Sequence, residues 1–233
     1  MTTATLTLED WRAWQPGRTP LDDRRLSVEE RPGATSLPAM LRRRLNGPGR
    51  AVCDMLAALD PGADCVLLHA SRHGDAARTL EMLYALTEGE PLSPARFGMS
   101  VHNAIVGVHS IASGNRRSLQ AIAASGAEVS ALFSEARGYL AEGEPQLIAV
   151  FSDAPVPARF AYHETHSEPA SAVALRLGLA TTPSAGRPLT SHDADEAMLR
   201  DARPPHPSDV IAWLLGEAPL ICPTRRLMWI LDS

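Results

Sequence analysis

The sequence predicts an α/β fold in which a mixed, mostly parallel sheet is flanked by helices. Apolar runs with the length and flanks of buried strands, such as Cys65 to Leu68 and Gln146 to Phe151, alternate with segments of helical spacing. This alternation is typical of parallel strands joined by crossover helices. Beyond Pro157 the connections become irregular and no clean crossover helix precedes Leu179, which favours antiparallel pairing there.

Composition bounds the domain count and the class of partner. The chain has 233 residues and 45% of them are hydrophobic, which is enough to bury a substantial core. We expect a single domain over residues 1–233, with an α/β part over 1–157 and a C-terminal part over 158–233 that extends the same sheet. The net charge of −5 disfavours nucleic acid as a partner. Because no apolar run approaches a bilayer span and the first residues lack a signal-peptide pattern, we expect a cytoplasmic protein without membrane contact.

The first half of the chain is assigned from capping residues and periodicity. Thr3 to Leu8 alternates in the way of a short strand. Ser36 is a candidate N-cap for a helix over Leu37 to Leu45, and a second helix is expected over about Arg50 to Ala58. After the strand at Cys65, helical spacing predicts a further helix from Asp75 to Thr87.

The second half begins with an uncharged segment, Phe97 to Ala112, which is expected to be largely helical and buried. Periodicity and flanking residues predict the remaining elements. These are the strand Ser118 to Ala123, the helix Glu128 to Ala141, the strand Gln146 to Phe151, the strand Ser171 to Leu179, the helix His206 to Leu215 and the strand Arg226 to Leu231.

No metal or cofactor site is expected from residue spacing. Ser71 to Asp75 contains a hydroxyl, an imidazole and a carboxylate, but a catalytic triad needs groups from separate elements, so a strand-to-helix turn capped by Asp75 is favoured. His163 and His166 are three residues apart, whereas helical zinc motifs need four. The three cysteines are too far apart in the sequence for a CxxC pair or a disulfide framework, and are expected to be buried: Cys53, Cys65 and Cys222.

Four stretches carry a family resemblance: SRHGDAARTLEML, SPARFGMSVHNAIVG, the helix containing Ser134-Glu135-Ala136, and LIAVFSDAPVP. The pattern SPxxFxxSVHN is the most specific of them. Together they resemble the β-ketoacyl synthase-like N-terminal family, in which the chain-length-factor subunits of bacterial aryl polyene pathways are found. The resemblance implies a thiolase-like half, because a full ketosynthase has two related α/β halves and this chain has room for about one.

The same resemblance implies a nucleophilic cysteine at the start of a buried helix, with two histidines supplied by the second half. Anchoring on Glu135-Ala136 and Gly143 places the nucleophile position at Gly126, which has no side chain to acylate. A shift of one residue places Ser125 there, and a serine without a positioned base is a poor nucleophile. No catalytic residue is therefore expected, and any activity of the chain alone stays uncertain.

A subunit that cannot be acylated is expected to act by forming part of a binding surface and not by catalysis. The resemblance implies a heterodimer with a full-length ketosynthase, in which this chain shapes an acyl tunnel for substrates on acyl carrier protein. The uncharged segment up to Val108 supplies the tunnel or interface candidates: Phe97, Met99, Ser100, Val101, His102, Asn103 and Val106. For His102 and Asn103, a buried polar pair between two elements is the favoured alternative.

Arginines at positions 42 to 44 are the candidate contact for the acyl carrier protein: Arg42, Arg43 and Arg44. A cationic patch speeds and orients the encounter with an acidic partner. Three consecutive helical residues cannot share one face, which favours a solvated surface instead. Two other functions stay open. One is an acyl-transfer or hydrolytic enzyme that uses Ser125 or Ser71, and the other is a homodimer that binds an acyl chain without a synthase.

Overall fold

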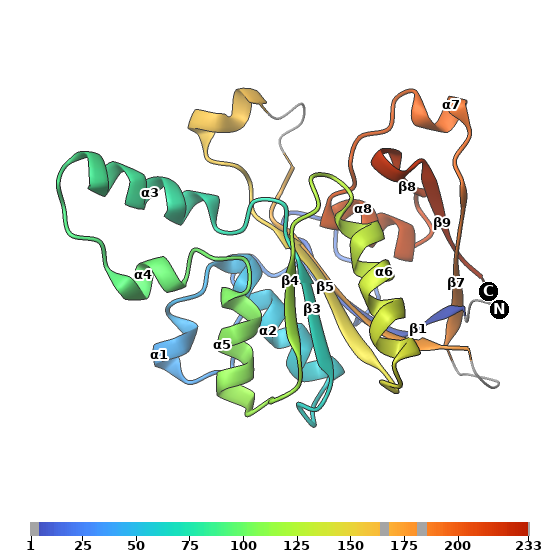
Figure 1. Ribbon diagram of the computed structural model, residues 1–233, viewed down its shortest axis with the longest axis horizontal. Coiled ribbons are helices and arrows are strands. Elements are labelled where there is room, and N and C mark those ends of the chain that lie inside the picture. Colours follow the sequence, from blue (N-terminus) through green and yellow to red (C-terminus); the bar gives the residue numbers. More distant parts are fainter. Residues whose placement is uncertain (1–4, 164–167, 181–185, 233) are drawn as a thin grey trace.

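The computed structural model describes residues 5–163, 168–180 and 186–232, and its strands form one sheet with helices on both faces (Figure 1). The strand order is β4-β3-β5-β6-β1-β7-β9-β8, with β2 beside β1. The strands are β1 (Leu6–Trp14), β2 (Leu26–Ser27), β3 (Val66–Ala70), β4 (Leu119–Ile122), β5 (Leu147–Asp153), β6 (Ser171–Leu179), β7 (Arg187–Asp193), β8 (Leu220–Cys222) and β9 (Leu227–Leu231). The helices are α1 (Ala39–Arg42), α2 (Gly47–Leu59), α3 (Ala76–Thr87), α4 (Pro94–Gly98), α5 (Ala104–Ser113), α6 (Glu128–Ala141), α7 (Glu196–Leu199) and α8 (Pro207–Leu214), with 3-10 turns η1 (Ala158–His163) and η2 (Pro223–Arg225).

Pairing changes along this sheet. β3 lies parallel to β4 and to β5, which are reached through α3–α5 and through α6. From β5 to β8, each neighbouring pair of described strands is antiparallel. The expected α/β fold with a mixed sheet is confirmed, and its parallel part is confined to β4-β3-β5 and the short β2 beside β1. Helices connect β3 to β4 and β4 to β5, which lets these three strands run parallel, whereas a short connection turns β8 back into β9.

The central strands are buried on both sides because their alternate side chains enter different cores. Val66, Leu68 and Ala70 of β3 pack in the core that contains α6 and α8, whereas Leu67 packs in the core with α2. On the first of these faces α6 also contacts β9 of the same sheet. There the ring of Phe133 meets that of Trp229 edge-on, with centroids 4.6 Å apart.

Residues 76–98, which contain α3 and α4 and are termed the arm below, project away from the sheet (Figure 1). Met82 is the buried residue of α3, and residues 94–98 are all exposed. An ion pair between Glu81 and Arg96 links the two helices. The arm therefore has little hydrophobic core of its own.

Several predicted bounds match the structure and some do not. Those of α6 and β6 are as predicted, whereas β1 continues past Leu8 to Trp14 because pairing with β6 resumes after an irregularity. The predicted helix Leu37 to Leu45 is only the short α1, which starts after Pro38 without a side-chain cap. The second helix starts earlier than expected, because the Asn46 side chain accepts the Gly49 N–H and caps α2.

The expected buried helix over Phe97 to Ala112 is two short helices separated by residues 99–103. Within the described part of the chain, no helix is long and apolar enough to cross a membrane.

Candidate functional site

Gly126, the predicted nucleophile position, lies in the turn between β4 and α6 and is buried. Its φ is +96°, and the preceding Ser125 has a φ of +48°. Two successive residues in this region of backbone space reverse the chain sharply, which glycine does at low cost. The local backbone therefore accounts for glycine at this position.

The surroundings of Gly126 leave no room for a side chain. A Cβ atom built on this residue would lie 2.9 Å from Pro204 Cβ and 3.0 Å from Pro204 Cγ. It would also lie 3.3 Å from Thr224 Oγ1. Because close-packed interiors tolerate no such overlap, a cysteine here would have to displace two C-terminal segments.

Glu128, the first residue of α6, turns back onto the turn that precedes the helix. Its buried carboxylate accepts the N–H of Ala124 at 3.2 Å and the N–H of Gly126 at 3.0 Å. Backbone N–H groups of a turn can together bind an anion. In this chain one of its own side chains takes these donors, so they are not free to hold a substrate oxygen.

Arg72 pairs with that carboxylate and joins the site to two other segments. Its Nη2 lies 3.3 Å from Glu128 Oε2 and donates to the Pro205 carbonyl oxygen at 2.9 Å. Its backbone N–H donates to Asp153 Oδ1 at 3.0 Å. The turn after β3, the start of α6 and the segment that contains Pro204 are thereby tied together by a buried, charge-assisted network.

Asp153 ends β5 and is also buried. It accepts the Ser71 hydroxyl at 2.7 Å, and burial raises its pKa to about 6 in spite of the bonds from Ser71 and Arg72. The Ser71 hydroxyl in turn accepts the Gly74 N–H at 2.9 Å. Both contacts of Ser71 hold the turn in place, which argues against its use as a nucleophile. The prediction of a strand-to-helix turn is confirmed, because Asp75 accepts the Arg78 N–H at the start of α3.

Two buried histidines lie near these residues and are kept neutral. His206 Nδ1 lies 3.3 Å from Ser171 Oγ, and burial, together with the nearby Arg72 and Arg203, lowers the pKa of His206 to about 3. His69 Nε2 lies 2.8 Å from Ser152 Oγ, and burial lowers the pKa of His69 to about 4. A histidine that stays uncharged at neutral pH in a hydrogen-bonded pair serves a structural role here.

The fold brings a cysteine close to the turn before α6. Cys222 is far from Gly126 in the sequence, yet its Sγ lies 4.0 Å from the Gly126 carbonyl oxygen. The thiol is fully buried and faces that oxygen. All three cysteines are buried and free, as expected, and burial raises the pKa values of Cys53 and Cys65 to about 12.

The tunnel and interface candidates are divided between the surface and the core. Phe97, Val101 and Asn103 are exposed, whereas Met99, Ser100 and His102 are half-buried. The His102 ring lies against Gly74, within 3.3 Å of a Cβ built there, and its carbonyl oxygen lies 3.0 Å from His69 Nδ1. These contacts agree with a polar link between two elements. Val106 is fully buried against α2, so it contributes no surface to an interface.

A small cavity of about 20 Å³, room for a single water molecule, lies between the segment after α4 and the ends of β3 and β5. Met99 and His102 line it from one side, and Ser71 and Asp153 from the other. This volume is far below that of an acyl chain, so the isolated chain holds no acyl tunnel at this position.

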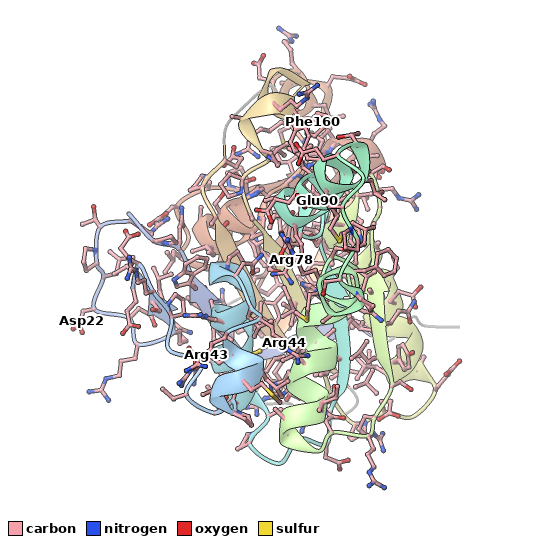
Figure 2. All side chains as sticks on the ribbon, turned by 90° about the vertical axis from the view of Figure 1, so that its left-hand side faces the viewer. Asp22, Arg43, Arg44, Arg78, Glu90 and Phe160 are labelled. Atoms are coloured by element: carbon pink, nitrogen blue, oxygen red, sulfur yellow. The ribbon has the colours of Figure 1, made fainter. Side chains whose placement is uncertain are left out.

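The three consecutive arginines lie at the end of α1. Arg43 and Arg44 are exposed on the face that Figure 2 shows, where Arg78 lies nearby and donates to the Arg44 carbonyl oxygen at 3.0 Å. Arg42 is half-buried. Of the histidine pair at residues 163 and 166, His166 lies outside the described residues. Within the described ranges, no group of three or more His, Cys, Asp or Glu side chains could hold a metal ion.

The comparisons with known proteins agree with the fold and the site. Residues 11–230 match the family described as "Beta-ketoacyl synthase, N-terminal domain", and the chain belongs to this family. No curated protein sequence matches the chain.

Among solved structures, the chain resembles one in "Ketosynthase (ApeO) in Complex with its Chain Length Factor (ApeC) from Xenorhabdus doucetiae". That match has 25% identity and a TM-score of 0.75, and it covers 98% of this chain and 99% of that chain. It also resembles "The ishigamide ketosynthase/chain length factor", with 14% identity, a TM-score of 0.60 and coverage of 84% of this chain and 70% of that one. A β-ketoacyl synthase from Burkholderia phymatum STM815 matches with 11% identity, a TM-score of 0.56 and coverage of 84% and 68%. The predicted family and the thiolase-like fold are confirmed.

Proposed function

We propose that this chain is a non-catalytic chain-length factor that forms a heterodimer with a full-length β-ketoacyl-ACP synthase. The observation that carries the proposal is the closed position of Gly126. A condensing enzyme must hold its acyl group on a nucleophile at this turn, whereas here the backbone has no side chain, Pro204 and Thr224 leave no space, and Glu128 takes two N–H groups of the turn. The role of this subunit in the pathway is then to form part of the wall of the tunnel that receives the growing acyl chain.

Two further observations support a partner subunit. The similar structure from Xenorhabdus doucetiae is a complex of a ketosynthase with its chain length factor. The match covers 98% of this chain and 99% of the matched chain. In addition, β4 ends the sheet on one side, next to a groove of about 590 Å³ lined largely by alanine and serine side chains. A strand at a sheet edge presents backbone groups that readily pair with another chain.

The pathway assignment is more specific than the subunit assignment. We place the heterodimer in cytoplasmic type II synthesis of aryl polyene pigments, where the ketosynthase receives its substrates from acyl carrier protein. The exposed Arg43 and Arg44, with Arg78 beside them, form a cationic patch that suits an acidic carrier protein. No cofactor enters this proposal.

Co-expression with a full-length ketosynthase from the same genome tests the proposal. We expect a one-to-one complex in size-exclusion chromatography. After incubation with acyl carrier substrates, intact mass measurement should find the acyl adduct on the ketosynthase and not on this chain. Failure of the two chains to associate would refute the heterodimer.

The same experiment separates the two alternatives. An adduct on this chain that disappears in Ser125→Ala or Ser71→Ala would identify it as an enzyme. A homodimer that retains an acyl chain in the absence of the synthase would identify it as an acyl-binding protein.

A further inference from the structure

A cavity of about 310 Å³ lies where two helices end, and it shares no lining residue with the site around Gly126. The helices are α2 and α5, which lie side by side on one face of the sheet (Figure 1). Ala57 from the last turn of α2 and Ser113 from the last turn of α5 both line the cavity. Ser36 and Pro61 are exposed lining residues, so solvent reaches it. Pockets of this size accommodate small molecules.

His109 is a buried polar group in the wall of this cavity. The residue exposes 3% of its surface, and neither ring nitrogen has a hydrogen-bond partner among the described residues. Burial lowers the pKa of His109 from its usual value, although Asp60 opposes the shift, so the ring is neutral at pH 7. A neutral imidazole has one lone pair and one N–H to satisfy, and a buried group left unpaired costs free energy. The cavity offers space for a bound molecule that supplies the missing partner.

The charges around the cavity select a cation. Asp60 is the one charged residue among the described residues that line it, and 7% of its surface is exposed. Its carboxylate accepts the N–H groups of Asp64 and Cys65 at 3.2 Å and 3.0 Å, which fixes the position of the two oxygens. The last carbonyl groups of a helix carry partial negative charge, and both α2 and α5 end here. An anion would be repelled by all of these groups.

An organic cation suits this cavity better than a metal ion. Protein sites for divalent metals use several side-chain ligands, and no group of three or more His, Cys, Asp or Glu in the described part of the chain could hold one. An alkylammonium group has three N–H bonds and needs acceptors for them. The carboxylate of Asp60, a nitrogen of His109 and the hydroxyl of Ser36 or Ser113 are acceptors of this kind. Leu37 adds apolar surface for the attached methylene groups.

We propose that this cavity binds a primary alkylammonium group, either of a free amine or of a lysine side chain. The ammonium group pairs with Asp60 and donates to His109, whose ring has no hydrogen bond to hold it and turns to present a nitrogen. This site is independent of the proposed function, because the chain alone contains all of its residues.

The test measures the binding of putrescine to the purified chain by titration calorimetry, with butanediol as the neutral probe of the same length. Lysine amide with an acetylated α-amino group, titrated separately, represents a lysine side chain. Asp60→Asn removes the charge from the cavity. Asp64→Asn is the matched control, because the Asp64 side chain is 85% exposed and does not line the cavity.

Two further variants act without touching this carboxylate. His109→Phe keeps a ring of similar size but removes both nitrogens, and Ala57→Met fills the cavity from α2 while every polar group stays in place. Circular dichroism and the thermal midpoint establish that each variant is folded. If Asp60→Asn does not fold, Ala57→Met decides the test.

We expect putrescine to bind and butanediol not to bind at the same concentration. Asp60→Asn should weaken putrescine binding by about 10-fold or more and His109→Phe by about fivefold, because hydrogen bonds between charged partners are the stronger ones. Ala57→Met should abolish binding, and Asp64→Asn should leave it unchanged.

The outcomes separate the two sources of the amine. Binding of the lysine amide alone, with the same dependence on Asp60, would support the site and identify its occupant as a lysine side chain. Binding of putrescine alone would identify a free amine. The proposal is overturned if neither amine binds, if butanediol binds as well as putrescine, or if the folded Asp60→Asn and Ala57→Met variants bind as wild type does.

Discussion

Replacement of Gly126 by alanine tests the obstructed turn directly. The substitution places a Cβ on a backbone with a φ of +96°, 2.9 Å from Pro204 Cβ. A non-glycine residue in such a conformation costs about 1–3 kcal/mol, and overpacking a buried site costs about another 1–3 kcal/mol. The free energy of unfolding should therefore fall by about 4 kcal/mol, which lowers Tm by about 8–16 °C for a domain of this size.

Urea and thermal unfolding, followed by circular dichroism, measure the effect. Gly138→Ala is the control, because Gly138 lies in α6, the helix that follows this turn, is exposed, and a Cβ there meets nothing within 4 Å. This control should stabilise the protein by about 0.5–1 kcal/mol. Combining Gly126→Ala with Pro204→Gly should recover the overpacking part, seen as a coupling energy of about 1–3 kcal/mol. Loss of less than about 1 kcal/mol in Gly126→Ala would show that the turn is open, which would remove the main support for a non-catalytic role.

Three further results are expected from the buried network. Burial raises the pKa of Asp153 from 3.8 to about 6, so the folded protein binds this proton more tightly than the unfolded chain does. Protonated Asp153 therefore stabilises the folded state fully below pH 3.8, and this stabilisation is lost as the pH rises to about 6. Asp153→Asn should therefore gain about 3 kcal/mol relative to wild type between about pH 4 and about pH 7 in urea titrations, and a constant difference would contradict this account. Glu128→Gln should lower the free energy of unfolding by about 2 kcal/mol or more, because it leaves Arg72 without its partner charge. The double variant with Arg72→Met should recover part of this loss. No loss in the single variant would show that the pair is not buried as described. Ser125→Ala should leave the acylation pattern of the ketosynthase complex unchanged by mass spectrometry, whereas a lost adduct would make this serine a nucleophile.

Local sequence signals were sufficient for the elements of the α/β body. The bounds of α6 and β6 were predictable because periodicity and apolar runs act over a few residues, and Asp75 was recognisable as a cap by its place before a helical repeat. The predictions failed where tertiary contacts override such signals. The chain continues β1 through Trp14 because β6, from a distant part of the sequence, pairs with it.

By itself, the sequence determined that the candidate nucleophile position holds a glycine and that the chain has the pattern of a ketosynthase-like half. Only the tertiary structure decided that this position is also closed, because Pro204 and Thr224 approach Gly126 from distant parts of the chain and Glu128 turns back onto its N–H. Likewise, the segment that begins at Phe97 was expected to be buried, yet the fold leaves part of it on an exposed arm and places Val106 in the core. Contacts between residues far apart in the sequence depend on how the sheet and helices pack, and no local pattern encodes that packing.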